Sequence, residues 1–168
     1  LPVAAAFLLL PASVAPAQVG GQWDSPLQTA GVGSFDHHGY AVAAAGDIDA
    51  DGVGDWLVGA PNLYGYSGRM GYVDAYSGAD GHRILHLESG FLGDEFGAAV
   101  AGPGDLNGDG HADILVGAPQ GDGRGLANTG VVRVYSGSNG FPMFRFDGFQ
   151  AYAHFGAAVA GAGDVDGD

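Results

Sequence analysis

Short runs of apolar residues recur along the chain, separated by stretches rich in glycine, aspartate and serine. The runs are too short for typical helices, contain many small or β-branched residues, and are bounded by glycine or proline, which is typical of strands joined by tight turns. We expect strands at residues 40–45, 56–59, 72–76, 83–87, 98–102, 114–117, 131–135 and 143–146. The pattern therefore predicts an all-β chain.

The order of strands and turns repeats. The Gly-Ala-Pro sequence at 59–61 recurs 58 residues later at 117–119, and the Phe-Gly sequence at 96–97 recurs 59 residues later at 155–156. Each repeat holds four expected strands, which is the sequence form of a four-stranded antiparallel β-propeller blade. Since a closed ring needs at least about four blades, we expect a fragment of about two and a half blades from a longer propeller.

The units can be given boundaries. The first residues combine a short apolar run with an Ala-x-Ala pattern at Ala15 to Ala17, typical of a secretory signal whose beginning is missing. The apolar run is too short to span a membrane, and the alternative is a buried strand or helix. We expect a signal at 1–17, a linker at 18–34 that contains a possible ring-closing strand at 23–29, repeats at 35–94 and 95–153, and the start of a third at 154–168.

Acidic side chains are concentrated between the first and second strand of each repeat. The segments 47–55 and 105–113 place side-chain oxygens at relative positions 1, 3, 5 and 9, with glycine at position 6. Ca²⁺ takes about six to eight oxygen ligands, which a tightly turned loop can supply from alternate short side chains and a backbone carbonyl. Val58 and Val116 occupy position 12, where an EF-hand needs a glutamate and then continues into a helix. Because short apolar runs follow the loops instead, we expect the loops to join strands.

Two complete calcium sites and the start of a third are predicted. Val53 and His111, at position 7, would contribute only their backbone carbonyls. The predicted ligands are Asp47, Asp49, Asp51, Val53 and Asp55 in the first loop, Asp105, Asn107, Asp109, His111 and Asp113 in the second, and Asp164, Asp166 and Asp168 in the third. The alternative is that these are acidic loops that only increase solubility.

Composition agrees with this assignment. The formal net charge is −14, but ten of the 19 acidic residues are aspartates of the three loops. With five arginines and no lysine the chain lacks the basic patch that nucleic-acid binding needs. Cysteine is absent, so no disulfide supports the fold. His82 and His86 have the spacing of a zinc motif, but a strand would separate them by roughly 13 Å.

These motifs, in this order and spacing, resemble the FG-GAP repeat of integrin α-subunit propellers and their bacterial relatives. The resemblance rests on the Phe-Gly pair at 96–97, the acidic loop at 105–113 and the Gly-Ala-Pro at 117–119. It implies a β-propeller with calcium between the first and second strand of each blade, acting in adhesion or ligand recognition. The first repeat departs from the pattern by carrying His38 where Phe96 and Phe155 stand in the others.

Two classes of function follow. The first is a non-enzymatic, calcium-binding propeller for adhesion or ligand recognition, secreted or held at the cell surface. The alternative is an accessory propeller of a larger secreted hydrolase or lipase whose catalytic residues lie elsewhere. A glycosidase or esterase motif in a longer form of the chain would favour the alternative.

A ligand face is also predicted. If each first strand runs toward its calcium loop, the loops 61–71, 89–96, 119–130 and 148–155 emerge at the opposite end. Exposed aromatic residues and arginines are typical of interaction hot spots, although they could instead pack between blades. The candidates for binding a protein or glycan partner are Tyr64, Tyr66, Arg69, Phe91, Arg124, Phe149 and Tyr152.

Overall fold

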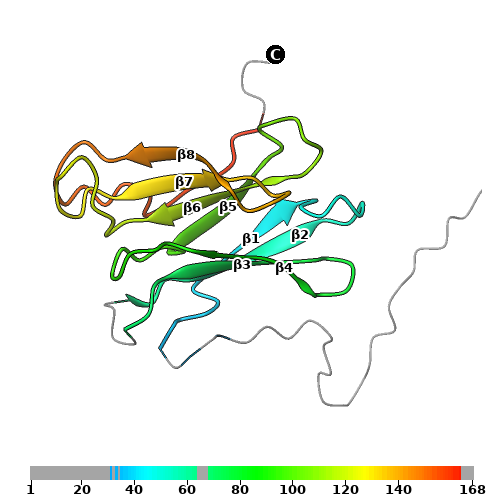
Figure 1. Ribbon diagram of the computed structural model, residues 1–168, viewed down its shortest axis with the longest axis horizontal. Helices are drawn as coiled ribbons and strands as arrows, with labels where there is room; N and C mark the ends of the chain where they lie inside the picture. Colours follow the sequence, from blue (N-terminus) through cyan, green and yellow to red (C-terminus); the bar gives the residue numbers. More distant parts are fainter. Residues whose placement is uncertain (1–30, 32, 34, 64–67, 164–168) are drawn as a thin grey trace, which may run out of the picture.

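The computed structural model describes residues 31, 33, 35–63 and 68–163. In this part of the chain, eight strands form two four-stranded antiparallel sheets (Figure 1). The first sheet contains β1 (Ala41–Gly46), β2 (Asp55–Ala60), β3 (Tyr72–Tyr76) and β4 (Arg83–Glu88). The second contains β5 (Ala99–Gly104), β6 (Asp113–Ala118), β7 (Val131–Tyr135) and β8 (Pro142–Asp147). Strand order follows sequence order in both sheets, so the predicted four-stranded antiparallel units are confirmed.

The two sheets stack face to face around one hydrophobic core (Figure 1). Because side chains alternate between the faces of a strand, Leu57 and Val73 of the first sheet share this core with Ile114, Val116 and Val131 of the second. All five residues are at most 1% exposed, and all five side chains are apolar. The seam between the sheets is therefore apolar along most of its length.

Two glycine pairs bring consecutive repeats into close contact. A Cβ atom on Gly59 would overlap the carbonyl oxygen of Gly97, and one on Gly117 would overlap that of Gly156. Gly97 and Gly156 have φ angles of 90° and 86°, in the region that favours glycine. The glycine of each Gly-Ala-Pro sequence thus packs against the Phe-Gly pair that opens the next repeat, which explains why the two motifs recur together.

Strand direction separates two sets of loops. Gly46 pairs with Asp55, and Ala60 pairs with Tyr72, so the acidic loop and the 61–71 connection leave opposite ends of the first sheet. The second sheet has the same arrangement; in Figure 1, β8 ends at the left, whereas β1 ends toward the right. The acidic loops therefore lie at one end of the sheets and the predicted ligand loops at the other.

Several predictions fall on residues that the structure does not describe. They are the signal at 1–17, the strand at 23–29, Tyr64, Tyr66, and the third loop with Asp164, Asp166 and Asp168. Within the described ranges, no helix is both long and apolar enough to cross a membrane.

Candidate metal centre and ligand face

The loop between β1 and β2 brings three carboxylates together. Asp47, Asp49 and Asp55 each offer an oxygen atom, and these atoms lie within 4.8 Å of one another. Asp47 and Asp49 are half-buried, whereas Asp55 is buried with 3% of its surface exposed. A set of oxygen ligands alone fits a hard cation such as Ca²⁺ or Mg²⁺ rather than a metal that prefers sulfur or nitrogen.

Backbone amides hold this loop in its turn. The Asp47 carboxylate accepts hydrogen bonds from the amides of Asp51, at 3.1 Å, and Gly52, at 2.9 Å. Gly52 has a φ angle of 88°, which is why glycine suits position 6. Asp51 lies outside the three-carboxylate group, and its side chain accepts the Val53 amide at 2.7 Å. Carboxylates that are already positioned lose less conformational entropy when they bind an ion.

The loop between β5 and β6 has the same framework but a different set of side chains. The Asp105 carboxylate accepts the amides of Gly108 and Gly110, both at 2.8 Å. Asn107 replaces an aspartate at position 3, and its amide donates to Asp109 at 3.1 Å. Asp109 also accepts the Ser138 hydroxyl at 2.8 Å, and this hydrogen bond lowers the pKa of the Asp109 carboxyl. Ser138, from the β7–β8 hairpin, was not predicted from the sequence.

The position-9 aspartates fasten each loop to a neighbouring hairpin. Asp55 accepts the amides of Ile48, at 2.6 Å, and Gly78, at 2.8 Å. Asp113 does the same in the second repeat, with Leu106 at 2.8 Å and Gly137 at 3.1 Å. These buried carboxylates therefore join the two ends of the acidic loop to the hairpin between the third and fourth strands.

Part of the predicted ligand face is assembled at the other end of the sheets. The Arg124 guanidinium lies 4.6 Å from the centre of the Phe149 ring, whose residue is 77% exposed. Tyr152, 67% exposed, donates its amide to Ala127 at 3.1 Å, which ties the 148–155 loop to the 119–130 loop. Arg69, in the connection between β2 and β3, is exposed and lies beside Gly33.

A cavity of about 360 Å³ lies between the 89–96 and 119–130 loops. Phe91 lines it, and the guanidinium of Arg133 lies 5.6 Å from the Phe91 ring centre. Asp94 is a further lining residue, and burial raises the pKa of its carboxyl. The Gln120 amide donates to the Asp94 carbonyl at 3.1 Å and so connects the two loops. The cavity thus joins polar and aromatic groups of the connection between the sheets with groups of the second sheet and its loops.

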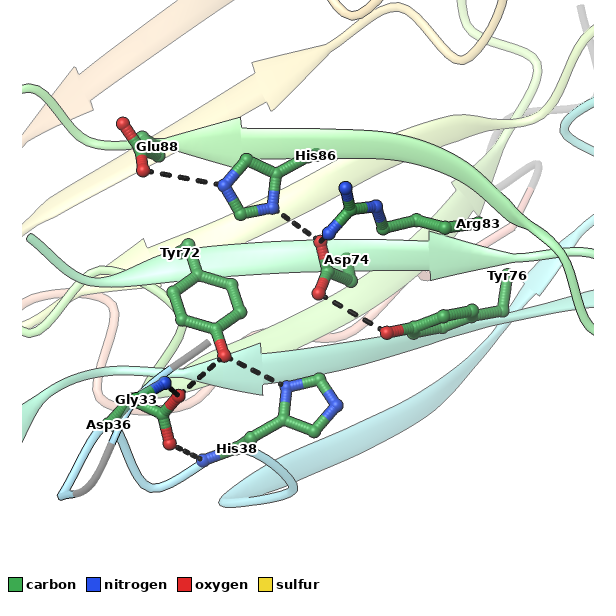
Figure 2. Close-up of polar contacts among 9 residues, drawn as sticks. All are labelled: Gly33, Asp36, His38, Tyr72, Asp74, Tyr76, Arg83, His86 and Glu88. Carbon is green, nitrogen blue, oxygen red and sulfur yellow. Dashed lines mark hydrogen bonds and ion pairs between the residues drawn. The ribbon is translucent and has the colours of Figure 1, made fainter. Parts of the chain in front are cut away.

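His38 retains the aromatic packing at the edge of the first sheet (Figure 2). Its ring stacks on Tyr72 with centres 5.8 Å apart, and the Tyr72 hydroxyl lies 3.3 Å from His38 Nδ1. The same hydroxyl donates to Asp36 at 2.8 Å. Phe96, at the equivalent position of the second repeat, is fully buried instead. The substitution therefore exchanges a buried apolar contact for a polar one.

A second polar cluster surrounds Asp74 in the middle of β3 (Figure 2). Asp74 is 0% exposed; its carboxylate lies 2.5 Å from His86 Nδ1 and 3.6 Å from the Arg83 guanidinium, and accepts the Tyr76 hydroxyl at 3.2 Å. Burial, and then the neighbouring Asp74, raise the pKa of Tyr76 to about 12. His82 pairs separately with Asp80 at 2.6 Å, so the two histidines of the zinc-like spacing have different partners.

Comparison with known proteins places these features in context. Residues 96–135 match the family model described as FG-GAP repeat. The chain is 34% identical to integrin alpha-V of Gallus gallus over 136 residues, and 36% identical to integrin alpha-IIb of Homo sapiens over 141 residues; each match covers 77% of this chain. It is 37% identical to integrin alpha-6 of Gallus gallus over 146 residues, or 81% of this chain. The matched region spans 13% of the length of each of these three relatives.

Proposed function

We infer that the chain, which is similar to integrin alpha chains over most of its length, belongs to the FG-GAP repeat family. We propose that it acts as a calcium-stabilised, non-enzymatic β-propeller in adhesion or ligand recognition. This role is the one that the resemblance to integrin-type propellers implies. The related proteins are integrin alpha chains, which favours a location at the cell surface or outside the cell. The repeat boundaries at 35–94 and 95–153 belong to the same proposal.

The observation that carries the calcium assignment is the convergence of Asp47, Asp49 and Asp55. Three carboxylates this close repel one another, and a divalent cation between them would remove that repulsion. Asp51 and the Val53 carbonyl would complete the first site. This site has a higher negative charge than the second, where Asn107 replaces an aspartate. Asp105, Asn107, Asp109, Asp113 and the His111 carbonyl would form the second, and Asp164, Asp166 and Asp168 would begin a third.

The proposed ligand face lies at the end of the sheets opposite the metal loops. The Arg124–Phe149 contact and the exposed Tyr152 support it, because arginine and aromatic side chains dominate interaction hot spots. The cavity beside Phe91 adds a concave surface next to them. A protein or glycan partner would dock there, with Arg69 and the predicted residues Tyr64 and Tyr66 as further candidates for contact, while calcium would stabilise the blades from the other end.

Calcium binding is tested by chelation of the intact protein. An ion that binds only the folded state stabilises it by about 2.7 kcal/mol when its concentration is 100 times the dissociation constant. We therefore expect EDTA to lower the melting temperature measured by calorimetry, and elemental analysis to find one fewer calcium ion in Asp49→Ala and in Asp109→Ala. Asp80→Ala, at an exposed aspartate in the adjacent hairpin, is the control and should retain every ion. An unchanged melting curve in EDTA, with no calcium in the protein, would refute the proposal.

A further inference from the structure

The two acidic loops contact each other across the seam between the sheets. The Ala112 amide donates to the backbone carbonyl of Asp47 at 2.8 Å. His111 Nδ1 lies 2.6 Å from the backbone carbonyl oxygen of Ile48, and because a carbonyl can only accept, the imidazole nitrogen is the donor. Both acceptors belong to the first loop and both donors to the second, so each loop is bonded directly to the other.

The side chain of Ile48 reinforces this contact. It is 0% exposed and shares the hydrophobic core between the sheets with Ala112. A Cβ atom on Gly137 would overlap the Ala112 carbonyl oxygen and lie 3.4 Å from Ile48 Cγ2, which shows how closely the β7–β8 hairpin covers the contact. The first loop therefore cannot shift without disturbing packed atoms of the second repeat.

Ile48 also connects this contact to the carboxylates. Its amide donates to the buried Asp55 carboxylate at 2.6 Å, while its carbonyl accepts from His111. Asp47 and Asp49 are its immediate neighbours in sequence. Ile48 is thus held by Asp55, a proposed ligand of the first site, and by the side chain of His111 from the second loop. The proposed metal contact of His111 is its backbone carbonyl, so its side chain is available for this hydrogen bond.

We propose that His111 is a positioning residue that couples the two sites, so that calcium at the second loop strengthens calcium binding at the first. The inference rests on the proposed calcium function. An ordered second loop holds His111 and Ala112 in place, which reduces the entropy that the first loop loses when it binds its own ion. The effect is reciprocal, because coupling between two equilibrium sites is the same in both directions.

His111→Ala separates this coupling from metal binding by the second loop itself. The substitution removes the hydrogen bond to Ile48 but leaves the backbone carbonyl at position 111. We expect about five-fold weaker calcium binding at the first loop, the effect of losing one hydrogen bond, in calorimetric titrations of the calcium-free intact protein with CaCl₂. His111→Asn places an amide N–H close to the position of Nδ1 and should restore most of the affinity.

His154→Ala is the matched control. His154 Nδ1 also lies near a backbone carbonyl, that of Pro119 at 3.2 Å, but at the ligand-face end of the second sheet. Its loss should leave both calcium affinities unchanged. If His111→Ala also leaves the first-loop affinity unchanged, or if His154→Ala weakens it equally, the specific coupling through His111 is overturned.

Disabling the second site completes the test. Asp109→Ala should weaken the first site about five-fold or more in the parent protein. The effect should be clearly smaller when His111 is already alanine, because the His111–Ile48 link is then lost and the Ala112–Asp47 hydrogen bond remains. An equal effect of Asp109→Ala in both backgrounds would overturn the coupling and leave the calcium function standing. A parent protein that binds no calcium would overturn both proposals.

Discussion

Aspartate side chains have different roles in this chain, and their burial distinguishes them. Asp47 and Asp49 are half-buried and remain accessible to an ion, whereas Asp55 and Asp113 are buried and accept backbone amides. Asp74 is buried within a strand, where its carboxylate is paired with the side chains of Tyr76, His86 and Arg83. A buried carboxylate is costly unless it is paired, so each of these positions depends on its partners.

The Asp74 cluster gives a prediction at this scale. Asp74→Ala removes the partner of His86, Tyr76 and Arg83 at once. His86 and Arg83 are partly exposed and can be solvated again, so we expect a loss of about 2 kcal/mol in the free energy of unfolding, in the range for hydrogen bonds to charged groups. Denaturant titration of the intact protein measures it.

Asp80→Ala is the control for this measurement. Asp80 also pairs with a histidine, His82, but both side chains are more than half exposed. Exposed ion pairs contribute little to stability, so this variant should unfold with the parent protein. Equal midpoints for the parent protein and Asp74→Ala would show that the buried cluster does not stabilise the sheet.

At the scale of the strands, close approach of backbones fixes how successive repeats pack. β2 and β6 end in Gly-Ala, and the glycine of each pair lies against the Phe-Gly turn of the next repeat. Any side chain at that glycine would push the next repeat away. The motif is therefore a packing device between repeats as well as a turn within one.

Gly117→Ala tests this packing. The new Cβ would overlap the Gly156 carbonyl, which is backbone and cannot rotate away, so we expect a destabilisation of about 1–3 kcal/mol, as for overpacked cores. Gly54→Ala, whose Cβ would meet no heavy atom within 4 Å, should be tolerated. Thermal unfolding of the two variants measures the difference, and an equal melting temperature for both would contradict the packing role.

At the scale of the molecule, strand direction places the metal loops and the proposed ligand face at opposite ends. Both sheets have the same direction of strands, so the acidic loops gather at one end and the longer connections at the other (Figure 1). The two ends can then have separate roles. Stability would depend on one end and recognition on the other.

A double variant tests this separation. Arg124→Ala with Phe149→Ala removes the cation–π pair of the ligand face, and we expect at least about ten-fold weaker binding to whichever glycans or extracellular matrix proteins the parent binds on immobilised panels. Its calcium content should not change. Phe141→Ala, an equally exposed aromatic residue at the metal-loop end, is the control and should bind normally. Binding that survives the double variant but is lost in Phe141→Ala would reverse the assignment of the two ends.

Much of the fold was predictable because its signals are local. The bounds of every strand were predicted to within two residues, since apolar runs and the glycines between them constrain only their own segments. The recurring acidic loops also indicated where Asp47, Asp49 and Asp55 would meet, because a short loop brings alternate side chains to one centre. The sequence by itself therefore determined the class of fold, the repeat and the first cluster of carboxylates.

Only the tertiary structure decided which distant residues support those loops. Ser138 lies 29 positions from Asp109, and His111 lies 63 positions from Ile48. Neither pair has a sequence signal, because the contacts depend on strand register and on how one sheet packs against the next. The separation of Asp74 and His86 is 12 positions, and here the antiparallel pairing of β3 with β4 sets the two side chains opposite each other. Local patterns specify elements, whereas long-range contacts follow from packing, which no single segment encodes.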